Sequence, residues 1–225
     1  MRVAYEPRPR LWLLSGVSTS YAVRLDAGDC LRHVHWGARV TLDEAVALAE
    51  QAERIPDPAA SSFEQEPGAD ELPVEGGARF GPAALQLRWA DLSRGIEWKY
   101  LGYEIVADGH LRVDLADRHY PLTVKLHYRI PAGSDVVERW TEVTNIGHEV
   151  ITLERCDSAA WTVATGQVSR LSHLVGAWNS EFRLHRTELP VAETVLTSRR
   201  GLTSHHANPW LALDDGTAGE ERGEV

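Results

Sequence analysis

Apolar and polar residues alternate over much of this chain. The clearest case runs from Leu122 to Ile130, where every second residue is apolar and Thr, Lys, His and Arg stand between them. Successive side chains of a β-strand point to opposite faces, so this period predicts a strand with one buried face. Similar alternation predicts strands at Tyr21–Leu25, Leu85–Trp89, Tyr100–Val106 and Leu111–Leu115.

One segment has a helical period instead. Thr41 and Glu44 have the spacing of a capping box. Apolar residues then recur three or four positions apart, as Leu42, Ala45, Val46, Ala49 and Ala52. Pro56 ends the pattern, so we predict one short helix near 41–55. From Pro56 to Gly81 the chain is rich in Pro, Gly, Ser, Asp and Glu, which predicts a long exposed loop.

Turn signals separate the predicted strands. Asp108-Gly109 is a strong hairpin signal, and residues 145–148 form a second tight turn. Many short strands with a turn every few residues are typical of a sandwich or a barrel. We therefore predict a mainly β protein, a β-sandwich of antiparallel strands with one short helix, as a single domain over residues 1–225. Residues 220–225 resemble the start of a further strand, so we expect the chain to be a fragment of a longer protein.

Charge and composition exclude several classes of function. The formal net charge of −10 argues against binding to nucleic acid or to an anionic membrane surface, which both require clustered Lys and Arg. Cys30 and Cys156 are the only cysteines, so no disulfide framework is needed. The apolar run Leu11–Leu14 is too short for a signal peptide or a membrane span. We therefore expect a cytoplasmic protein.

Candidate catalytic groups are sparse. Val34 separates His33 from His35, so on a regular strand both would lie on one face, where they are either a pair of metal ligands or part of a polar surface. No third ligand follows at a recognisable spacing, which favours the polar surface. Asp157 is expected to raise the pKa of the Cys156 thiol, which argues against a nucleophile. No phosphate loop, Gly-x-Ser-x-Gly or His-Glu-x-x-His motif occurs.

The sequence indicates a recognition surface more clearly than a catalytic site. It contains eight Trp residues, and Trp178 stands between Gly176 and the polar run 179–181. An exposed indole can stack on the C–H face of a sugar while polar neighbours bind its hydroxyls. Alternatively, Trp178 packs inward and Glu181 pairs with Arg183 or Arg199. The spacing leaves both readings open.

Several segments resemble the glycoside hydrolase family 36 α-galactosidases. The family segment Gly-Arg-Trp-x-x-Glu is similar to residues 176–181, which read Gly-Ala-Trp-Asn-Ser-Glu. The family segment Ser-x-Arg-Gly-x-Ser-Ser-His-x-x-Asn-Pro is similar to residues 198–209. Residues 31–39 match Leu-x-His-x-x-Trp-Gly-x-Arg, and residues 220–225 match Glu-x-x-Gly-Glu-Val. The resemblance covers essentially the whole chain.

The resemblance implies an N-terminal β-supersandwich whose catalytic (β/α)8 barrel lies beyond this chain. The barrel carries two catalytic aspartates, and neither of their motifs occurs here. It further implies a retaining mechanism without metal or organic cofactor, α-galactosides as substrates of the full enzyme, and a homo-oligomer in which this domain helps to complete a sugar pocket. The residues expected at that pocket or at the subunit interface are Trp178, Glu181, Arg79, Trp36 and His205. Ala78 stands where the family pattern has Asp.

Three hypotheses follow. The first is a non-catalytic N-terminal domain of an α-galactosidase, inactive alone, that supports oligomerisation and the sugar pocket. The second is a stand-alone carbohydrate-binding module for α-galactosides. The third is a complete small enzyme that uses the face carrying His33 and His35.

Overall fold

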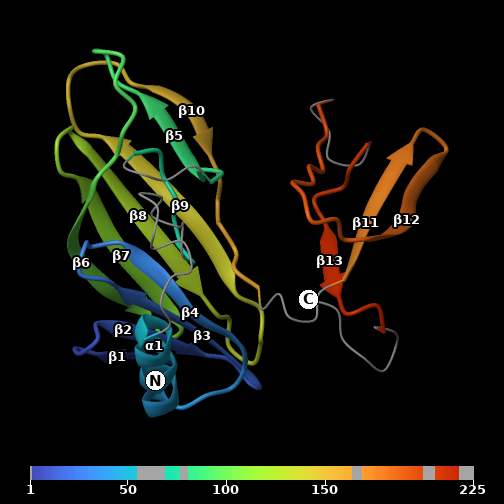
Figure 1. The fold of residues 1–225 in the computed structure, drawn as a ribbon, viewed down its shortest axis with the longest axis horizontal. Helices are drawn as coiled ribbons and strands as arrows, with labels where there is room; N and C mark the ends of the chain where they lie inside the picture. Colours follow the sequence, from blue (N-terminus) through green and yellow to red (C-terminus); the bar gives the residue numbers. More distant parts are fainter. Residues whose placement is uncertain (1, 55–68, 77–80, 164–168, 200–205, 218–225) are drawn as a thin grey trace. The chain divides into compact units, whose positions relative to one another are not determined.

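A computed structural model describes residues 2–54, 69–76, 81–163, 169–199 and 206–217. These contain thirteen strands and one helix, and all strand pairs are antiparallel. The mainly β class and the single helix predicted from the sequence are therefore confirmed. The chain forms two compact units, residues 1–162 and residues 163–225, which we describe separately (Figure 1).

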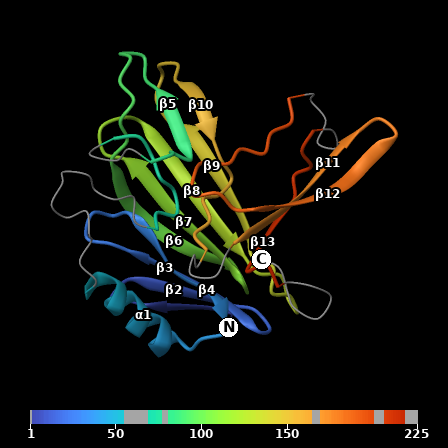
Figure 2. The same ribbon diagram turned by 45° about the vertical axis from the view of Figure 1, so that its right-hand side comes forward.

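The first unit begins with a four-stranded sheet in chain order. Its strands are β1 (Val3–Glu6), β2 (Leu11–Ser15), β3 (Thr19–Leu25) and β4 (Leu31–Ala38). The helix α1 (Leu42–Arg54) covers the outer face of this sheet (Figure 2). As a result both faces of β3 are buried, with Tyr21 and Val23 on one side and Ala22 against α1. The alternation showed the two faces but could not show that a helix covers the second one.

The start of α1 has the predicted capping box. The backbone N–H of Glu44 donates to Thr41 Oγ1 at 3.3 Å, and the backbone N–H of Thr41 donates to Glu44 Oε2 at 2.7 Å. These reciprocal bonds satisfy N–H groups that have no partner within the helix. Ala45 and Ala49 then face Leu11, Leu13 and Ala22 of the sheet. Their small side chains allow close approach, and together they form a second, smaller core.

A second four-stranded sheet packs against the inner face of the first. It contains β6 (Trp98–Ala107), β7 (His110–Asp117), β8 (Leu122–Arg129) and β9 (Glu138–Asn145). The predicted hairpin turn is confirmed, since Ala107 pairs with His110 around Asp108-Gly109. Gly109 has φ of +83°, and a Cβ there would lie 2.6 Å from the carbonyl oxygen of Ile130. The turn therefore requires glycine.

The main core lies between these two sheets. The predicted buried face of β8 is confirmed, because Leu122, Val124, Leu126, Tyr128 and Ile130 are all buried. They pack with residues of the first sheet, among them Trp12, Leu14, Tyr21 and Val23. This packing of two sheets is the sandwich that the turn spacing predicted.

A bulge in β4 changes one prediction. Val23 pairs with His33, but the adjacent Ala22 pairs with His35, so Val34 is an extra residue in β4. Val23 faces the core between the sheets and Ala22 faces α1. The prediction that His33 and His35 share one face is therefore wrong, because it assumed a regular strand.

The segment 69–76 corrects a second prediction. It belongs to the stretch predicted to be an exposed loop, yet Asp70, Glu71, Leu72 and Val74 are buried. Its backbone pairs with β4, since the N–H of His33 donates to the carbonyl of Ala69 at 2.6 Å. Further along, Val74 forms a parallel bridge with Leu85 of β5 (Leu85–Arg88), which pairs with β10 (Thr152–Cys156). Acidic composition suggested exposure, but the acidic side chains have buried partners.

The second unit contains a three-stranded sheet. Its strands are β11 (Arg170–Ala177), β12 (Ser180–Glu188) and β13 (Leu211–Asp214), and β11 lies in the centre. The N–H of Ser169 donates to the carbonyl of Asp214 at 2.9 Å, and the N–H of Leu189 donates to the carbonyl of Ser169 at 2.7 Å. Residues 220–225 lie outside the described residues, and so does the strand predicted there.

Candidate functional site

The hairpin between β11 and β12 presents the predicted recognition residues. Ala177 pairs with Ser180, so Trp178 and Asn179 form the turn. Asn179 has φ of +61°, a conformation that Asn tolerates better than most residues. The Glu181 carboxylate accepts a hydrogen bond from the backbone N–H of Asn179, with 3.0 Å between Oε1 and N. The Glu181 side chain therefore stabilises the turn that carries Trp178.

The Trp178 side chain is not packed inward in this hairpin. It is 87% exposed, whereas a structural Trp is usually covered. Of the two readings that the sequence left open, the described contacts therefore favour an exposed indole. Glu181 pairs with neither Arg183 nor Arg199 among the contacts of the described residues.

A second exposed aromatic residue, Phe182, stands beside the turn. It is 66% exposed and has φ of +54°, which is uncommon for an aromatic residue. The register shows the reason: between the pairs Val175–Arg183 and Ala177–Ser180, β12 has one more residue than β11. This bulge places Phe182 in a strained conformation. The sequence analysis missed Phe182, because a bulge leaves no clear signal in an alternating pattern.

The segment after β12 returns alongside the hairpin. The backbone N–H of His206 donates to the carbonyl of Gly176 at 3.2 Å, and that of Asn208 donates to the carbonyl of Leu174 at 3.0 Å. Two shallow hollows of about 220 Å³ and about 200 Å³ adjoin this segment. Leu196, Asn208 and Pro209 line both, and Trp210 lines the second. The structure thus places Gly176 of the segment 176–181 next to His206 of the segment 198–209, two segments selected from the sequence.

The other candidate residues lie elsewhere. Trp36 belongs to the first unit, where its ring centroid is 4.9 Å from Trp161 and 6.2 Å from Tyr21. Arg79, His205 and Ala78 lie outside the described residues, so their predicted roles stay predictions. Trp36 is thus part of an aromatic cluster of the sandwich, and Trp178 is part of a hairpin turn in the other unit.

A buried polar cluster lies beneath the Trp36–Trp161 pair. The Glu71 carboxylate accepts hydrogen bonds from the Tyr21 hydroxyl at 2.7 Å and the Tyr128 hydroxyl at 3.1 Å, and it forms an ion pair with Arg139 at 2.8 Å. His33 Nδ1 lies 3.1 Å from the same carboxylate. Burial, together with the Glu71 charge, raises the pKa of both tyrosines. Both phenols therefore stay protonated and donate to Glu71. His33 contacts the same buried carboxylate, and this contact gives His33 a structural role.

The remaining reactive side chains do not form a catalytic set in the described part of the chain. His35 Nε2 lies 2.9 Å from the carbonyl oxygen of Ala38, on the other side of the sheet from His33. Burial, and secondly the Asp157 charge, raises the pKa of the Cys156 thiol, so the predicted direction is confirmed. Among the described residues, no three His, Cys, Asp or Glu side chains are grouped to hold a metal ion. Likewise, no described helix is long and apolar enough to cross a membrane.

Together these features define a class: an antiparallel β protein in which, among the described residues, the most exposed aromatic side chains lie on a hairpin in its second unit. Comparison with protein families then gives the identity. The chain belongs to glycosyl hydrolase family 36, since the model of the N-terminal domain of that family matches residues 29–225. The resemblance found in the sequence is therefore confirmed.

Known relatives agree with this assignment. The α-galactosidase AgaA of Geobacillus stearothermophilus is 28% identical over 248 residues, which cover 100% of this chain and 34% of AgaA. The α-galactosidase Mel36A of Lactobacillus acidophilus is 24% identical and is matched over 34% of its length. The crystal structure of the α-galactosidase AgaB of G. stearothermophilus has a TM-score of 0.82 at 26% identity, covering 98% of this chain and 33% of AgaB. The chain spans about a third of the length of these relatives and matches their N-terminal domain.

Proposed function

We propose that this chain is the non-catalytic N-terminal domain of an α-galactosidase that hydrolyses terminal α-D-galactosyl residues of galacto-oligosaccharides. The observation that carries the proposal is the family match over residues 29–225, combined with relatives that are named α-galactosidases. One structural relative, a variant of AgaA, is in complex with raffinose, an α-galactoside. In this proposal the catalytic carboxylates lie in a (β/α)8 barrel outside the 225 residues. The isolated chain is then inactive.

The proposed role of the domain is architectural and supportive. The sandwich of the first unit provides a rigid body, and the hairpin of the second unit presents Trp178 for contact with a sugar or with a neighbouring subunit. Exposing Trp178 and Phe182 to water is unfavourable, which favours their being covered in the assembled enzyme. We further propose a homo-oligomer in the cytoplasm, in which Arg79 and His205 contribute to the pocket or the interface.

The proposal is tested by activity measurements on two proteins. The full reading frame is expected to cleave a chromogenic α-galactoside, whereas the purified 225-residue chain is expected to show no turnover. In the full protein, Trp178→Ala should raise KM for raffinose about tenfold, which corresponds to a loss of about 1.4 kcal/mol of binding from the missing indole. Leu92→Ala, which removes an exposed apolar side chain of the first unit, serves as the control. Turnover by the rigorously pure chain alone would refute the assignment of a non-catalytic domain.

The exposure of Trp178 also favours a second candidate, a stand-alone carbohydrate-binding module. Titration calorimetry of the isolated chain with galactose, melibiose and raffinose distinguishes the two. Millimolar or tighter binding that Trp178→Ala abolishes would favour the module. No measurable heat, together with light scattering that shows self-association, would favour the domain of a larger enzyme.

A further inference from the structure

The hairpin of the second unit contains a residue whose backbone conformation does not suit its side chain. Phe182 has φ of +54°, in the left-handed region that glycine and asparagine adopt far more readily than an aromatic residue. Its side chain is 66% exposed, and it belongs to neither of the two hydrophobic cores found among the described residues. Core packing therefore does not offset the unfavourable conformation of Phe182.

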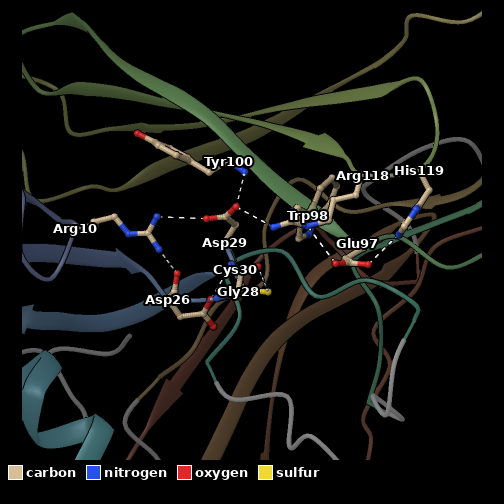
Figure 3. A network of polar contacts seen from close by, with 10 residues as sticks. All are labelled: Arg10, Asp26, Gly28, Asp29, Cys30, Glu97, Trp98, Tyr100, Arg118 and His119. Atoms are coloured by element: carbon tan, nitrogen blue, oxygen red, sulfur yellow. Dashed lines mark hydrogen bonds and ion pairs between the residues drawn. The ribbon is translucent and has the colours of Figure 1, made fainter.

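Two residues of the first unit show how such a conformation is normally stabilised. Arg10 and Asp29 both have φ of +62°. Figure 3 shows the Asp29 carboxylate between two guanidinium groups, those of Arg10 at 3.3 Å and Arg118 at 3.0 Å. The same carboxylate accepts the backbone N–H of Tyr100 at 3.3 Å. Contacts within the fold thus explain the strain at Arg10 and Asp29.

The backbone of the hairpin does not require a phenyl ring at position 182. The bulge in β12 accounts for the positive φ, and glycine adopts such a φ without steric cost. A phenylalanine here is therefore less favourable for the hairpin than a glycine would be. Strain that the fold itself does not reward is found at sites of binding and catalysis, where the side chain has a task outside the fold.

The neighbours of Phe182 indicate which kind of ligand its ring contacts. Residues 178–183 read Trp-Asn-Ser-Glu-Phe-Arg, so exposed charged side chains, Glu181 and Arg183, stand on both sides of Phe182. The cores of protein–protein interfaces are depleted of charged residues. Sugar sites combine an aromatic ring, which stacks on C–H groups, with charged and amide groups that bind hydroxyls. The composition of this hairpin therefore favours a sugar over an apolar protein surface.

The hairpin has room for more than one sugar unit. Ser180 follows the turn that carries Trp178, and Phe182 lies two residues further along β12, about 7 Å by strand geometry. We propose that Phe182 is a specificity-determining residue, whose ring stacks on a second sugar unit of a galacto-oligosaccharide while Trp178 contacts the first. This assignment rests on the function proposed above and adds a preference for substrates with several sugar rings.

Kinetics of the full protein test the assignment with two substrates of different length. Phe182→Gly should raise KM for the trisaccharide raffinose about tenfold, equivalent to about 1.4 kcal/mol. The value of kcat should stay unchanged, because the stacking contact is lost equally from the bound substrate and from the transition state. KM for methyl α-galactoside, which has a single sugar ring, should change less than about twofold.

Two further variants and a stability measurement separate binding from a structural role. Phe182→Tyr keeps an aromatic ring, and Leu184→Ala removes another exposed apolar side chain of β12, so both should leave KM for raffinose near the parental value. In the 225-residue chain, Phe182→Gly should not lower the urea midpoint measured by circular dichroism, because glycine tolerates the positive φ.

The outcomes distinguish this assignment from the function on which it rests. An unchanged KM for raffinose in Phe182→Gly, or an equal rise for both substrates, would overturn the role of Phe182 and leave the α-galactosidase function in place. A rise in KM together with a lowered urea midpoint would make Phe182 a structural residue and would overturn its role as well. Failure of the full reading frame to cleave any α-galactoside would refute the proposed function and the role of Phe182 with it.

Discussion

The two compact units of this chain differ most in how they bury their strands. In residues 1–162, two sheets and a helix enclose a continuous core, and strands such as β3 are buried on both faces. In residues 163–225, the described apolar residues that are buried are Leu171 and Ala212, and β12 is exposed from Glu181 to Glu188 apart from its pairing with β11. Most strand stability comes from packing, so the first unit should be stable by itself and the second should depend on partners.

The difference also explains where recognition residues are found. A side chain that packs against a core uses its surface in contacts with its neighbours, as Trp36 does with Trp161 and Tyr21. A sparsely packed hairpin leaves its side chains available, as with Trp178 and Phe182. The first unit therefore suits the role of scaffold, and the second suits contact with a ligand or another chain. Four measurements test this contrast.

The largest effect is expected from the buried ion pair of the first unit. The Arg139 and Glu71 side chains are 2% and 1% exposed, and Arg139 also lies 4.9 Å from the ring centroids of Tyr128 and Trp161. Arg139→Ala should lower the free energy of unfolding by about 3–5 kcal/mol, because it leaves Glu71 charged and buried without its counterion. Urea denaturation followed by tryptophan fluorescence measures this.

A matched control for this variant is the exposed pair between Arg94 and Glu154. Arg94→Ala should cost at most about 1 kcal/mol, because solvent already screens that pair. If both variants destabilised the protein equally, burial would not be what distinguishes the Glu71 cluster.

The next effect compares the same substitution in the two units. Leu126 in β8 is buried, whereas Leu184 in β12 is half exposed. Leu126→Ala should cost about 2–5 kcal/mol through lost burial and the cavity it leaves, and Leu184→Ala about 0.5 kcal/mol or less. Urea midpoints from circular dichroism give both values. Comparable losses would mean that β12 is packed in solution, and the contrast between the units would fail.

A smaller effect is expected at the start of α1. Thr41→Ala removes the Oγ1 atom that accepts the backbone N–H of Glu44 and should cost about 1 kcal/mol. Thr41→Ser keeps an acceptor and should cost much less. Thermal unfolding of the three proteins measures the difference. Equal melting temperatures would mean that packing of Ala45 and Ala49 alone holds the helix.

The smallest effect is a pH dependence on the outer face of the second sheet. Burial lowers the pKa of His110 and of His127. The charges of Arg129 and Arg112 lower the pKa of His110 further. For His127, Glu142 acts to raise the pKa, whereas His110, Arg112 and Lys125 act to lower it. Glu104 and Glu138 also face His110 and act to raise its pKa. The two rings are joined at 3.0 Å between Nε2 and Nδ1, and His127 stacks on Trp140 at 4.5 Å.

The sign follows from these lowered values. As the pH falls below about 6.5, the unfolded chain takes up protons before the folded chain does, so stability decreases. Urea midpoints at pH 7.5 and pH 5.5 should therefore differ, and the difference should shrink in His127→Gln. His148→Gln, in an exposed turn, is the control. An unchanged difference in His127→Gln would assign the pH dependence to other groups.

Much of the first unit was predictable from the sequence. The alternation at 122–130 identified β8 and its buried face, Asp108-Gly109 identified a hairpin, and Thr41 with Glu44 identified the start of α1. These features are local: each depends on neighbours within a few residues. The resemblance to the family was also carried by short segments such as 176–181. Local chemistry and short motifs therefore sufficed for the fold class and for the family.

The arrangement of distant residues was not predictable in this way. The bulge at Val34, the burial of Glu71 and the bulge that exposes Phe182 depend on pairing and packing between segments far apart in the chain. A period of two cannot show an inserted residue, and an acidic side chain looks exposed until its buried partners are known. Strand positions and family membership could thus be inferred from the order of the residues. Which side chains are covered became known only from the folded chain, because burial is a property of the neighbours that folding brings together.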